Sequence, residues 1–294
     1  MNNKVLVIGA AFVDIIMKVS KLPKTGEDVT GKIDTMVVGG CAINVFGALQ
    51  YEKADATLFV PVGEGMYANL VRKRLNSTKV PIIIDDNQMD NGWDICFVEP
   101  SGERTFITVQ GIEQNWKSEW FDLIDLNEYQ YFYLSGYETE DKNSTKVIFE
   151  KLDQSKTKKT ILFDASPRIR YIDEDIKKRI LSNDVIVHCN EEEIEFLSEE
   201  KNFENKLNDI YSKTKMPVIV TLGSKGTCIF DNRGKRIIPA DKIRVVNTIG
   251  AGDTHCGGLL AGLQKGLSID EAVKLGNNLA GVVVQQSEGN LKYG

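Results

Sequence analysis

The chain has 294 residues, of which 42% are hydrophobic and 27% charged, a composition typical of a globular protein rather than a disordered chain. This length gives a prior of about two domains, although α/β folds of this size often form one. The 36 Lys and Arg residues against 42 Asp and Glu residues give a formal net charge of −6. This balance excludes a general nucleic-acid binder, which needs a basic surface, but it does not exclude a small anionic ligand.

Few residues are suited to metal or disulfide chemistry. The five cysteines are scattered, without a C-x-x-C pair, and we interpret them and the two histidines (His188 and His255) as packing residues. This pattern argues against a zinc enzyme. Near the N-terminus Asp14 interrupts a short apolar run, and no run approaches the ~20 apolar residues of a membrane span. We therefore expect a cytoplasmic protein.

The first half of the chain mixes strands and helices. Apolar and β-branched runs predict strands, and helical periodicity predicts two helices between them. The expected strands are residues 5–8, 29–38, 56–61, 81–84, 93–98 and 105–109, and the expected helices are 42–50 and 67–75. Pro100 and Gly102 predict a hairpin turn between the last two strands.

The second half of the chain alternates regularly between strands and helices. The expected strands are residues 130–134, 160–164, 184–188 and 217–222, followed by a β-rich segment at 226–246 and helices at 251–265 and 269–286. This spacing predicts βαβ units and a mostly parallel sheet with helices on both faces, which is the α/β fold class. No repeat or linker divides the chain. We therefore expect one core, with the strands at 29–38 and 93–109 as an appendage.

A glycine-rich turn lies near the C-terminus. A β-branched run gives way to Gly250-Ala251-Gly252-Asp253, and a helical rhythm follows. Glycines at 250 and 252 permit a tight turn and leave peptide N–H groups uncovered at a helix start, where the helix dipole favours an anion. Asp253 is then either a helix cap or a base beside an anion hole.

The turn is part of a longer motif, because residues 247–253 resemble the D-T-T-G-A-G-D signature of the ribokinase (PfkB) family of sugar and nucleoside kinases. Four further motifs occur in the family's order: Gly9-x-x-x-x-Asp14, Gly39-Gly40-x-x-x-Asn44, Asn190-x-x-Glu193 and the T-L-G-x-x-G loop of residues 221–226. The resemblance covers essentially the whole chain. It implies a single domain (1–294) with a Rossmann-like, three-layer α/β core, a mostly parallel central sheet and a small β lid at about residues 11–38 and 93–110.

The resemblance also implies roles for the acceptor site. Asp253 would be the base that deprotonates the acceptor hydroxyl, and the N–H groups of Gly250, Ala251 and Gly252 would form the anion hole. The acceptor itself would be bound by Asp14, Gly39, Gly40 and Asn44. Gly136-Tyr137-Glu138, which follows a predicted central strand, is a further candidate for reaching the acceptor.

A second group of residues would bind ATP, the implied co-substrate. These are Asn190, Thr221, Gly223, Ser224, Gly226 and Asn277, the last on the adenine side. Glu193 would hold Mg²⁺ through water, and we expect Asn190 and Glu193, three residues apart, to share one helical face. The alternative is that the acidic run 191–193 is ordinary solvated charge.

The chain departs from the family signature at two positions. Asn247 and Ile249 replace the Asp and the second Thr that help to hold potassium in K⁺-activated members. Asn lacks the charge and Ile lacks a side-chain oxygen. We therefore do not carry over a K⁺ requirement and predict weak or absent K⁺ activation.

Taken together, the motifs predict ATP-dependent phosphorylation of a hydroxyl on a sugar or sugar-like compound. One alternative is a nucleoside kinase that acts on a ribonucleoside or pseudouridine, for which Phe12, Phe46 and Trp93 are candidate stacking groups. Another is a catalytically silent ligand-binding regulator on the same fold. Exposed lid strands predict a homodimer, and neither nucleic acid nor membrane is expected as a partner.

Overall fold

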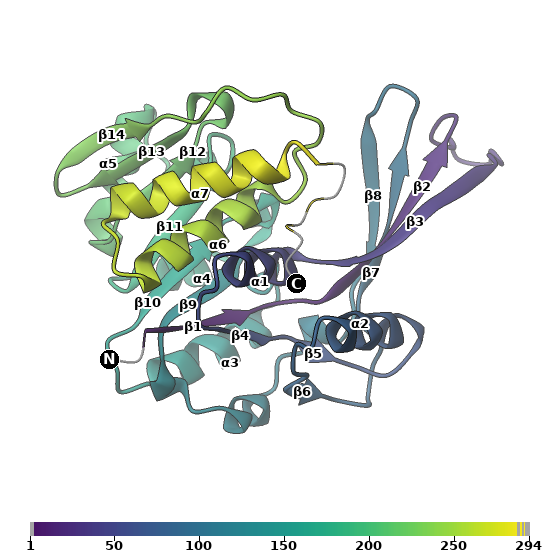
Figure 1. Ribbon diagram of the computed structural model, residues 1–294, viewed down its shortest axis with the longest axis horizontal. Coiled ribbons are helices and arrows are strands. Elements are labelled where there is room, and N and C mark those ends of the chain that lie inside the picture. The colour runs from purple at the N-terminus through teal and green to yellow at the C-terminus, as the bar shows by residue number, and fades with distance from the viewer. Residues whose placement is uncertain (1–2, 287–288, 290, 292–294) are drawn as a thin grey trace.

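Figure 1 shows the computed structural model, which describes residues 3–286, 289 and 291. Helices enclose a large central sheet, and a smaller sheet projects from one side of this body. Among the helices of the described segments, none combines the length and the apolar character needed to cross a bilayer.

The central sheet has eight strands in the spatial order β14-β13-β12-β11-β10-β9-β1-β4. Neighbours from β12 to β4 are parallel, whereas β13 and β14 add an antiparallel edge. The strands are β1 (Lys4–Ile8), β4 (Ala56–Phe59), β9 (Tyr129–Ser135), β10 (Thr160–Asp164), β11 (Val185–Asn190), β12 (Val218–Thr221), β13 (Thr227–Asp231) and β14 (Gly234–Ile238). The parallel strands are short apolar runs because helices cover both of their faces.

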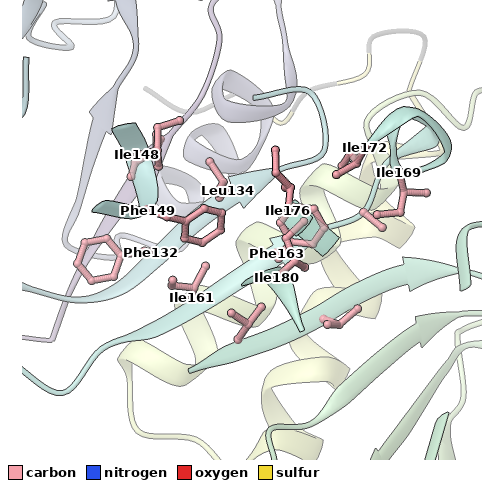
Figure 2. Packing of buried hydrophobic residues seen from close by; sticks show 14 of the residues in the cluster. Phe132, Leu134, Ile148, Phe149, Ile161, Phe163, Ile169, Ile172, Ile176 and Ile180 are labelled. Atoms are coloured by element: carbon pink, nitrogen blue, oxygen red, sulfur yellow. The ribbon is translucent and has the colours of Figure 1, made fainter. Parts of the chain in front are cut away.

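Alternate residues of the central strands belong to two separate cores, since successive side chains of a strand point to opposite faces. On one face, Phe132 and Phe163 pack among residues of α3, α4 and α5 (Figure 2). On the other face, Tyr133 and Leu162 pack with α1, α2, α6 and α7. The three-layer α/β arrangement predicted from the strand–helix alternation is therefore confirmed.

The helices have the following bounds. The α-helices are α1 (Cys41–Tyr51), α2 (Met66–Ser77), α3 (Lys142–Asp153), α4 (Glu174–Ile180), α5 (Phe203–Thr214), α6 (Ala251–Gln264) and α7 (Ile269–Val283). The 3₁₀ helices are η1 (Ile112–Gln114), η2 (Ser118–Leu123), η3 (Leu126–Glu128), η4 (Pro167–Tyr171), η5 (Glu193–Phe196) and η6 (Gly223–Lys225).

The smaller sheet has four strands in the order β3-β2-β7-β8. They are β2 (Phe12–Val19), β3 (Gly31–Gly39), β7 (Trp93–Val98) and β8 (Arg104–Val109), and a separate pair is formed by β5 (Pro61–Val62) and β6 (Ile84–Asp85). Strands β2 and β7 are parallel, and each has an antiparallel partner on its outer side. Trp93 stacks on Tyr67 of α2 with ring centroids 5.0 Å apart, so α2 covers one face of this sheet.

Two of the predicted strands are wrong in part. Residues 81–83 are not in a strand, because β6 pairs with only the two residues of β5. The predicted β-rich segment 226–246 ends at Ile238, where the hairpin of β13 and β14 is complete, and residues 239–246 form no strand. The predicted turn between β7 and β8 is present, with Gly102 at a φ of 88°.

Candidate active site

Two helix starts meet at the centre of the candidate site. Helices α1 and α6 lie side by side (Figure 1), and each begins after a glycine of positive φ, Gly40 at 100° and Gly250 at 71°. About two turns further along α6, a Cβ on Gly257 would lie 2.5 Å from the Cβ of Ala48 and 2.6 Å from the carbonyl oxygen of Val45. The absent side chain at this position therefore permits the close approach of the two helices.

This approach brings together Asn44 and Asp253, one from the first turn of each helix. Asn44 Nδ2 donates to Asp253 Oδ2 at 2.8 Å, and the Cys41 thiol also donates to this carboxylate. Burial, reinforced by the nearby Asp164 carboxylate, raises the pKa of Asp253 to about 6, against the opposing effect of the Asn44 hydrogen bond. A carboxylate with this pKa is ionised at neutral pH and is basic enough to accept a proton.

The glycine-rich turn leaves space in front of α6. A Cβ on Gly252 would meet no atom within 4 Å, whereas one on Gly250 would lie 1.8 Å from the carbonyl oxygen of Gly289. Gly252 and Asp253 are first-turn residues, so their backbone N–H groups have no acceptor within the helix. This geometry suits an anion at the start of α6.

Asp14 lies on β2, beside the end of β3. A Cβ on Gly39 would be 2.7 Å from Asp14 Oδ2, and one on Gly40 would be 2.7 Å from the carbonyl oxygen of Ala10. The two glycines therefore allow β3 to pass Asp14 and turn directly into α1. The turn joins β3, which passes beside Asp14, to the helix that carries Asn44.

The structure adds a carboxyl group that the motif comparison missed, Asp94 on β7. It is the registered neighbour of Asp14 in the parallel β2–β7 pair. Burial, with the Asp14 carboxylate alongside, raises the pKa of Asp94 to about 7, and burial also raises the pKa of Asp14. The sequence predicts a strand at residues 93–98 and so places Asp94 in a strand, but only the register of β2 and β7 shows that Asp94 lies beside Asp14.

The other predicted residues lie at the carboxyl ends of adjacent parallel strands. Asn190 ends β11 and is the registered neighbour of Thr221, which ends β12, while Asp164 ends β10 beside Ser135 of β9. This edge is where open α/β sheets bind ligands. Asp164, which the motif comparison did not identify, interacts electrostatically with both Asp253 and Glu193.

The expectation that Asn190 and Glu193 share one helical face is wrong. Asn190 is the last residue of a strand, and its Oδ1 accepts from the N–H groups of Glu192 and Glu193 at 2.8 and 2.9 Å. In return the Glu193 carboxylate accepts from Asn190 N at 2.9 Å. Glu193 is only 8% exposed, so it is not solvated surface charge, and burial raises its pKa to about 7.

The loop of residues 221–226 forms the turn η6 after β12. Gly226 has a φ of 100°, and a Cβ there would lie 2.1 Å from the carbonyl oxygen of Ile238, so this glycine is required by the turn itself. Gly223 and Ser224 are exposed at the turn. Lys225 approaches Glu191 at 3.9 Å, which places the loop beside the turn that carries Asn190.

Asn277 ends a buried chain of hydrogen bonds. Its Oδ1 accepts from Thr227 Oγ1 at 2.7 Å, and its Nδ2 donates to the carbonyl oxygen of Ile238 at 3.1 Å. From Thr227 the chain continues through His255 and His188 to Asp164, with steps of 3.2, 3.1 and 2.8 Å. The two histidines, interpreted from the sequence as incidental packing residues, therefore link two parts of the site.

One further group could in principle hold a metal ion. One possible ligand atom from each of Asp164, His188 and Cys256 lies within 4.8 Å of the other two. Both ring nitrogens of His188 already have hydrogen-bond partners. Burial raises the pKa of the Cys256 thiol well above its ordinary value, which disfavours the thiolate that a metal needs. We therefore interpret this group as part of the hydrogen-bonded core.

The candidate aromatic residues are largely used in packing. Trp93 stacks on Tyr67, and Phe46 is 5% exposed within the core. Glu138, from the segment considered at the acceptor, is buried and accepts from Ser135 N at 3.1 Å. Burial raises the pKa of Glu138 to about 7. A Cβ on Gly9 would lie 3.1 Å from Glu138 Oε1, so this carboxyl group abuts the end of β1.

Comparison with known proteins agrees with this geometry. The family described as pfkB family carbohydrate kinase matches residues 2–292. The chain belongs to the PfkB family. It is 35% identical to an uncharacterised sugar kinase of Escherichia coli, YegV, over 98% of this chain and 91% of that protein. The chain is therefore a sugar or nucleoside kinase, a phosphotransferase with a hydroxyl group as acceptor.

Two solved structures illustrate the range of the fold. The ribokinase of Arabidopsis thaliana, complexed with ribose and ATP, superposes with a TM-score of 0.80 at 19% identity, over 98% of this chain and 94% of that one. The nucleoside kinase of Burkholderia thailandensis, in complex with inosine, gives a TM-score of 0.77 at 19% identity, over 97% and 91%. At these identities the likeness shows the ribokinase-like fold.

Proposed function

We propose that this PfkB-family kinase transfers the γ-phosphoryl group of ATP to a hydroxyl of a sugar or nucleoside, with Asp253 as the general base. The observation that carries the proposal is the Asn44–Asp253 contact where α1 and α6 begin. It places a basic carboxylate, a hydrogen-bonding amide and an anion-binding helix start at one point. A base, a group that positions it and an anion-binding site all favour attack by a hydroxyl on a phosphoryl group.

In the proposed step, Asp253 accepts the proton of the acceptor hydroxyl as its oxygen attacks the γ-phosphorus. A new P–O bond to the acceptor forms while the bond to the bridging oxygen of ADP breaks. The N–H groups of Gly250, Ala251 and Gly252 stabilise the charge on the transferring group, and the Ala251 N–H leaves its 3.3 Å bond to the carbonyl oxygen of Thr248 to do so. Asn44 keeps the Oδ2 atom of Asp253 in place and stabilises its ionised form.

The remaining residues divide into an acceptor side and a nucleotide side. Asp14, Gly39, Gly40 and Asn44 form the acceptor side, on β2, at the end of β3 and on α1. The nucleotide side comprises Asn190, Thr221, Gly223, Ser224, Gly226 and Asn277. Asp253 lies between the two sides, as an in-line transfer requires.

Mg²⁺ fits the residues at the carboxyl end of β11. Burial, and after it repulsion by the nearby Asp164 carboxylate, raises the pKa of Glu193 to about 7, and a bound cation would relieve this repulsion. Oxygen ligands of this kind suit a hard cation that keeps several waters. Glu193 would therefore hold it through water, with Asp164 adding negative charge nearby, and when bound the ion would neutralise phosphate charge.

We also propose that the four-stranded sheet is the lid of the acceptor site and a dimer contact. Glu113 accepts from the N–H groups of Gly92 and Gly111 at 2.9 and 2.7 Å and thereby ties the inner ends of β7 and β8 to the body. At the sheet's outer part, Ile33, Phe106 and Ile107 are each at least half exposed. Such apolar exposure is suited to pairing with a second copy.

The test is an assay of ADP release with Mg-ATP over pentoses, hexoses, keto-deoxy sugar acids and nucleosides. Asp253→Asn should abolish turnover and retain binding of ATP and acceptor. Asp122→Asn, at an exposed position on η2, is the matched control and should behave as the wild type. Unchanged turnover of Asp253→Asn would exclude this base, and binding without turnover in the wild type would favour a silent regulator.

A further inference from the structure

Asp94 has a buried carboxylate oxygen that nothing in the described residues satisfies. The side chain is 8% exposed, it shares a hydrogen bond with Asp14, and its Oδ1 atom has no hydrogen-bond partner within the described part of the chain. A buried acceptor left in this state costs free energy unless a ligand donates to it.

The strand register shows which way this oxygen faces. Side chains alternate along β7, and its neighbour Trp93 packs onto α2, so Asp94 lies on the opposite face of the sheet. Asp14, its cross-strand neighbour, lies on the same face and touches the end of β3 at Gly39. Both carboxyl groups therefore face the side on which α1 begins.

No described lysine or arginine pairs with these carboxyl groups, and the cations Arg104 and Arg168 act instead on the neighbouring Cys96 and Tyr137. Within the described residues, neither Asp14, Asp94 nor Asp253 forms an ion pair with a lysine or arginine. An acceptor with its own carboxylate or phosphate would be repelled by these carboxylates, and no ion-paired cation beside them offsets its desolvation. Hydroxyl groups, by contrast, donate hydrogen bonds to carboxylate oxygens.

We propose that Asp94 is a specificity-determining residue, which together with Asp14 binds two adjacent hydroxyl groups of an uncharged acceptor and excludes sugar acids and sugar phosphates. One hydroxyl donates to Asp94 Oδ1 and the other to Asp14. This inference rests on the proposed function, because it assigns the substrate class of the same site. It concerns binding and not the transfer step.

The first experiment compares matched neutral and anionic acceptors with the full chain and Mg-ATP. The pairs are D-fructose with D-fructose 6-phosphate and D-glucose with D-gluconate, and D-ribose and inosine complete the neutral set. We expect kcat/KM for the preferred neutral acceptor to exceed that of every anionic one by about 100-fold or more. Equal or better use of an anionic acceptor would overturn the inference while leaving the kinase activity established.

The second experiment tests Asp94 itself. With the preferred neutral acceptor, Asp94→Ala should raise KM about tenfold or more and change kcat by less than about threefold, because Asp94 does not touch the reacting groups. Acceptor analogues that lack one hydroxyl group distinguish a binding role of Asp94 from a purely structural role, because a structural role would not change how much each hydroxyl contributes to binding. Loss of the hydroxyl that donates to Asp94 should weaken binding to the wild type more than binding to Asp94→Ala, since the variant has already lost that contact.

Asp94→Asn keeps the size of the side chain and carries the test if Asp94→Ala does not fold. At pH 9, where Asp94 with its pKa of about 7 is ionised, the variant should raise kcat/KM for anionic acceptors about tenfold relative to neutral ones, because one negative charge is removed. Unchanged selectivity and unchanged KM in both variants would overturn the assignment of Asp94.

The rise in Tm that a bound acceptor causes distinguishes a failure of the proposed kinase function from a failure of the inference about Asp94. If neutral acceptors raise the Tm of the wild type but not of Asp94→Ala, and nothing is phosphorylated, the kinase function fails and the binding inference stands. If no neutral acceptor on the panel binds or reacts, the inference itself is overturned.

Discussion

Asn44 and Asp253 are 209 positions apart in the chain, yet Asn44 Nδ2 donates to Asp253 Oδ2 at 2.8 Å. Each residue lies in the first turn of its helix, so the contact also fixes the two helix starts relative to one another. Because this hydrogen bond favours the ionised carboxylate and burial opposes it, Asp253 has an intermediate basicity.

This balance predicts the pH dependence of turnover. Asp253, with a pKa of about 6, accepts a proton only when it is ionised, so activity should be lost as the pH falls through about 6 and should fall about tenfold per unit below it. The measurement is kcat/KM with Mg-ATP from pH 5 to 9. A profile that is flat down to pH 5 would contradict the role of Asp253.

Replacing Asn44 should move this profile. Asn44→Ala removes a hydrogen bond that lowers the pKa of Asp253, so the midpoint should shift upward by about one unit, and KM for the acceptor should rise. Asn205→Ala, on the exposed side of α5, is the control and should leave the profile in place. A lower kcat with an unshifted midpoint would mean that Asn44 does not act through Asp253.

The Asp14–Asp94 pair predicts a stabilising substitution. The pKa of Asp94 is about 7 in the folded protein against 3.8 in an ordinary setting, so the folded state is penalised above pH 7 and the penalty disappears as the pH falls toward 4. Asp94→Asn should raise the free energy of unfolding by about 1–3 kcal/mol at pH 8 and by less at pH 5. Urea denaturation at both pH values measures this difference. A destabilised variant at pH 8 would show that the pair is not in repulsion.

The crossing of α1 and α6 depends on Gly257. Gly257→Ala places a methyl group 2.5 Å from the Cβ of Ala48 and should cost about 1–3 kcal/mol of stability, because one helix must move. The displacement should also lower kcat, since Asn44 and Asp253 lie one turn away. Gly281→Ala in α7 is the matched control, because its nearest contact of 3.5 Å is ordinary and alanine favours the helix. Equal stabilities of the two variants would contradict the proposed close contact.

The K⁺ prediction depends on the segment before α6. Asn247 Oδ1 accepts from Ile249 N at 3.0 Å, and the Ile249 side chain offers no oxygen. Initial rates should therefore be equal in Na⁺ and K⁺ buffers of the same ionic strength. The double variant Asn247→Asp, Ile249→Thr restores the D-T-T-G-A-G-D signature and should gain stimulation by K⁺. Strong K⁺ stimulation of the wild type would refute the prediction.

The sequence alone was sufficient for the fold class and for the order of the motifs. Strands β9 to β12 and the helices between them could be predicted because the spacing of apolar residues within each short segment distinguishes a strand from a helix. Glycines such as Gly250 could also be assigned to a turn, because their requirement is for the backbone conformation of one residue.

Only the tertiary structure determined which side chains meet. The register of β2 and β7 brings Asp94 to Asp14, the carboxyl end of β10 brings Asp164 toward Asp253 and Glu193, and packing joins His188 to His255. Such contacts depend on strand register and helix crossing, which are decided by packing over the whole core rather than by neighbours in the chain. The motifs therefore predict a kinase, whereas the acceptor it selects depends on residues that only folding brings together.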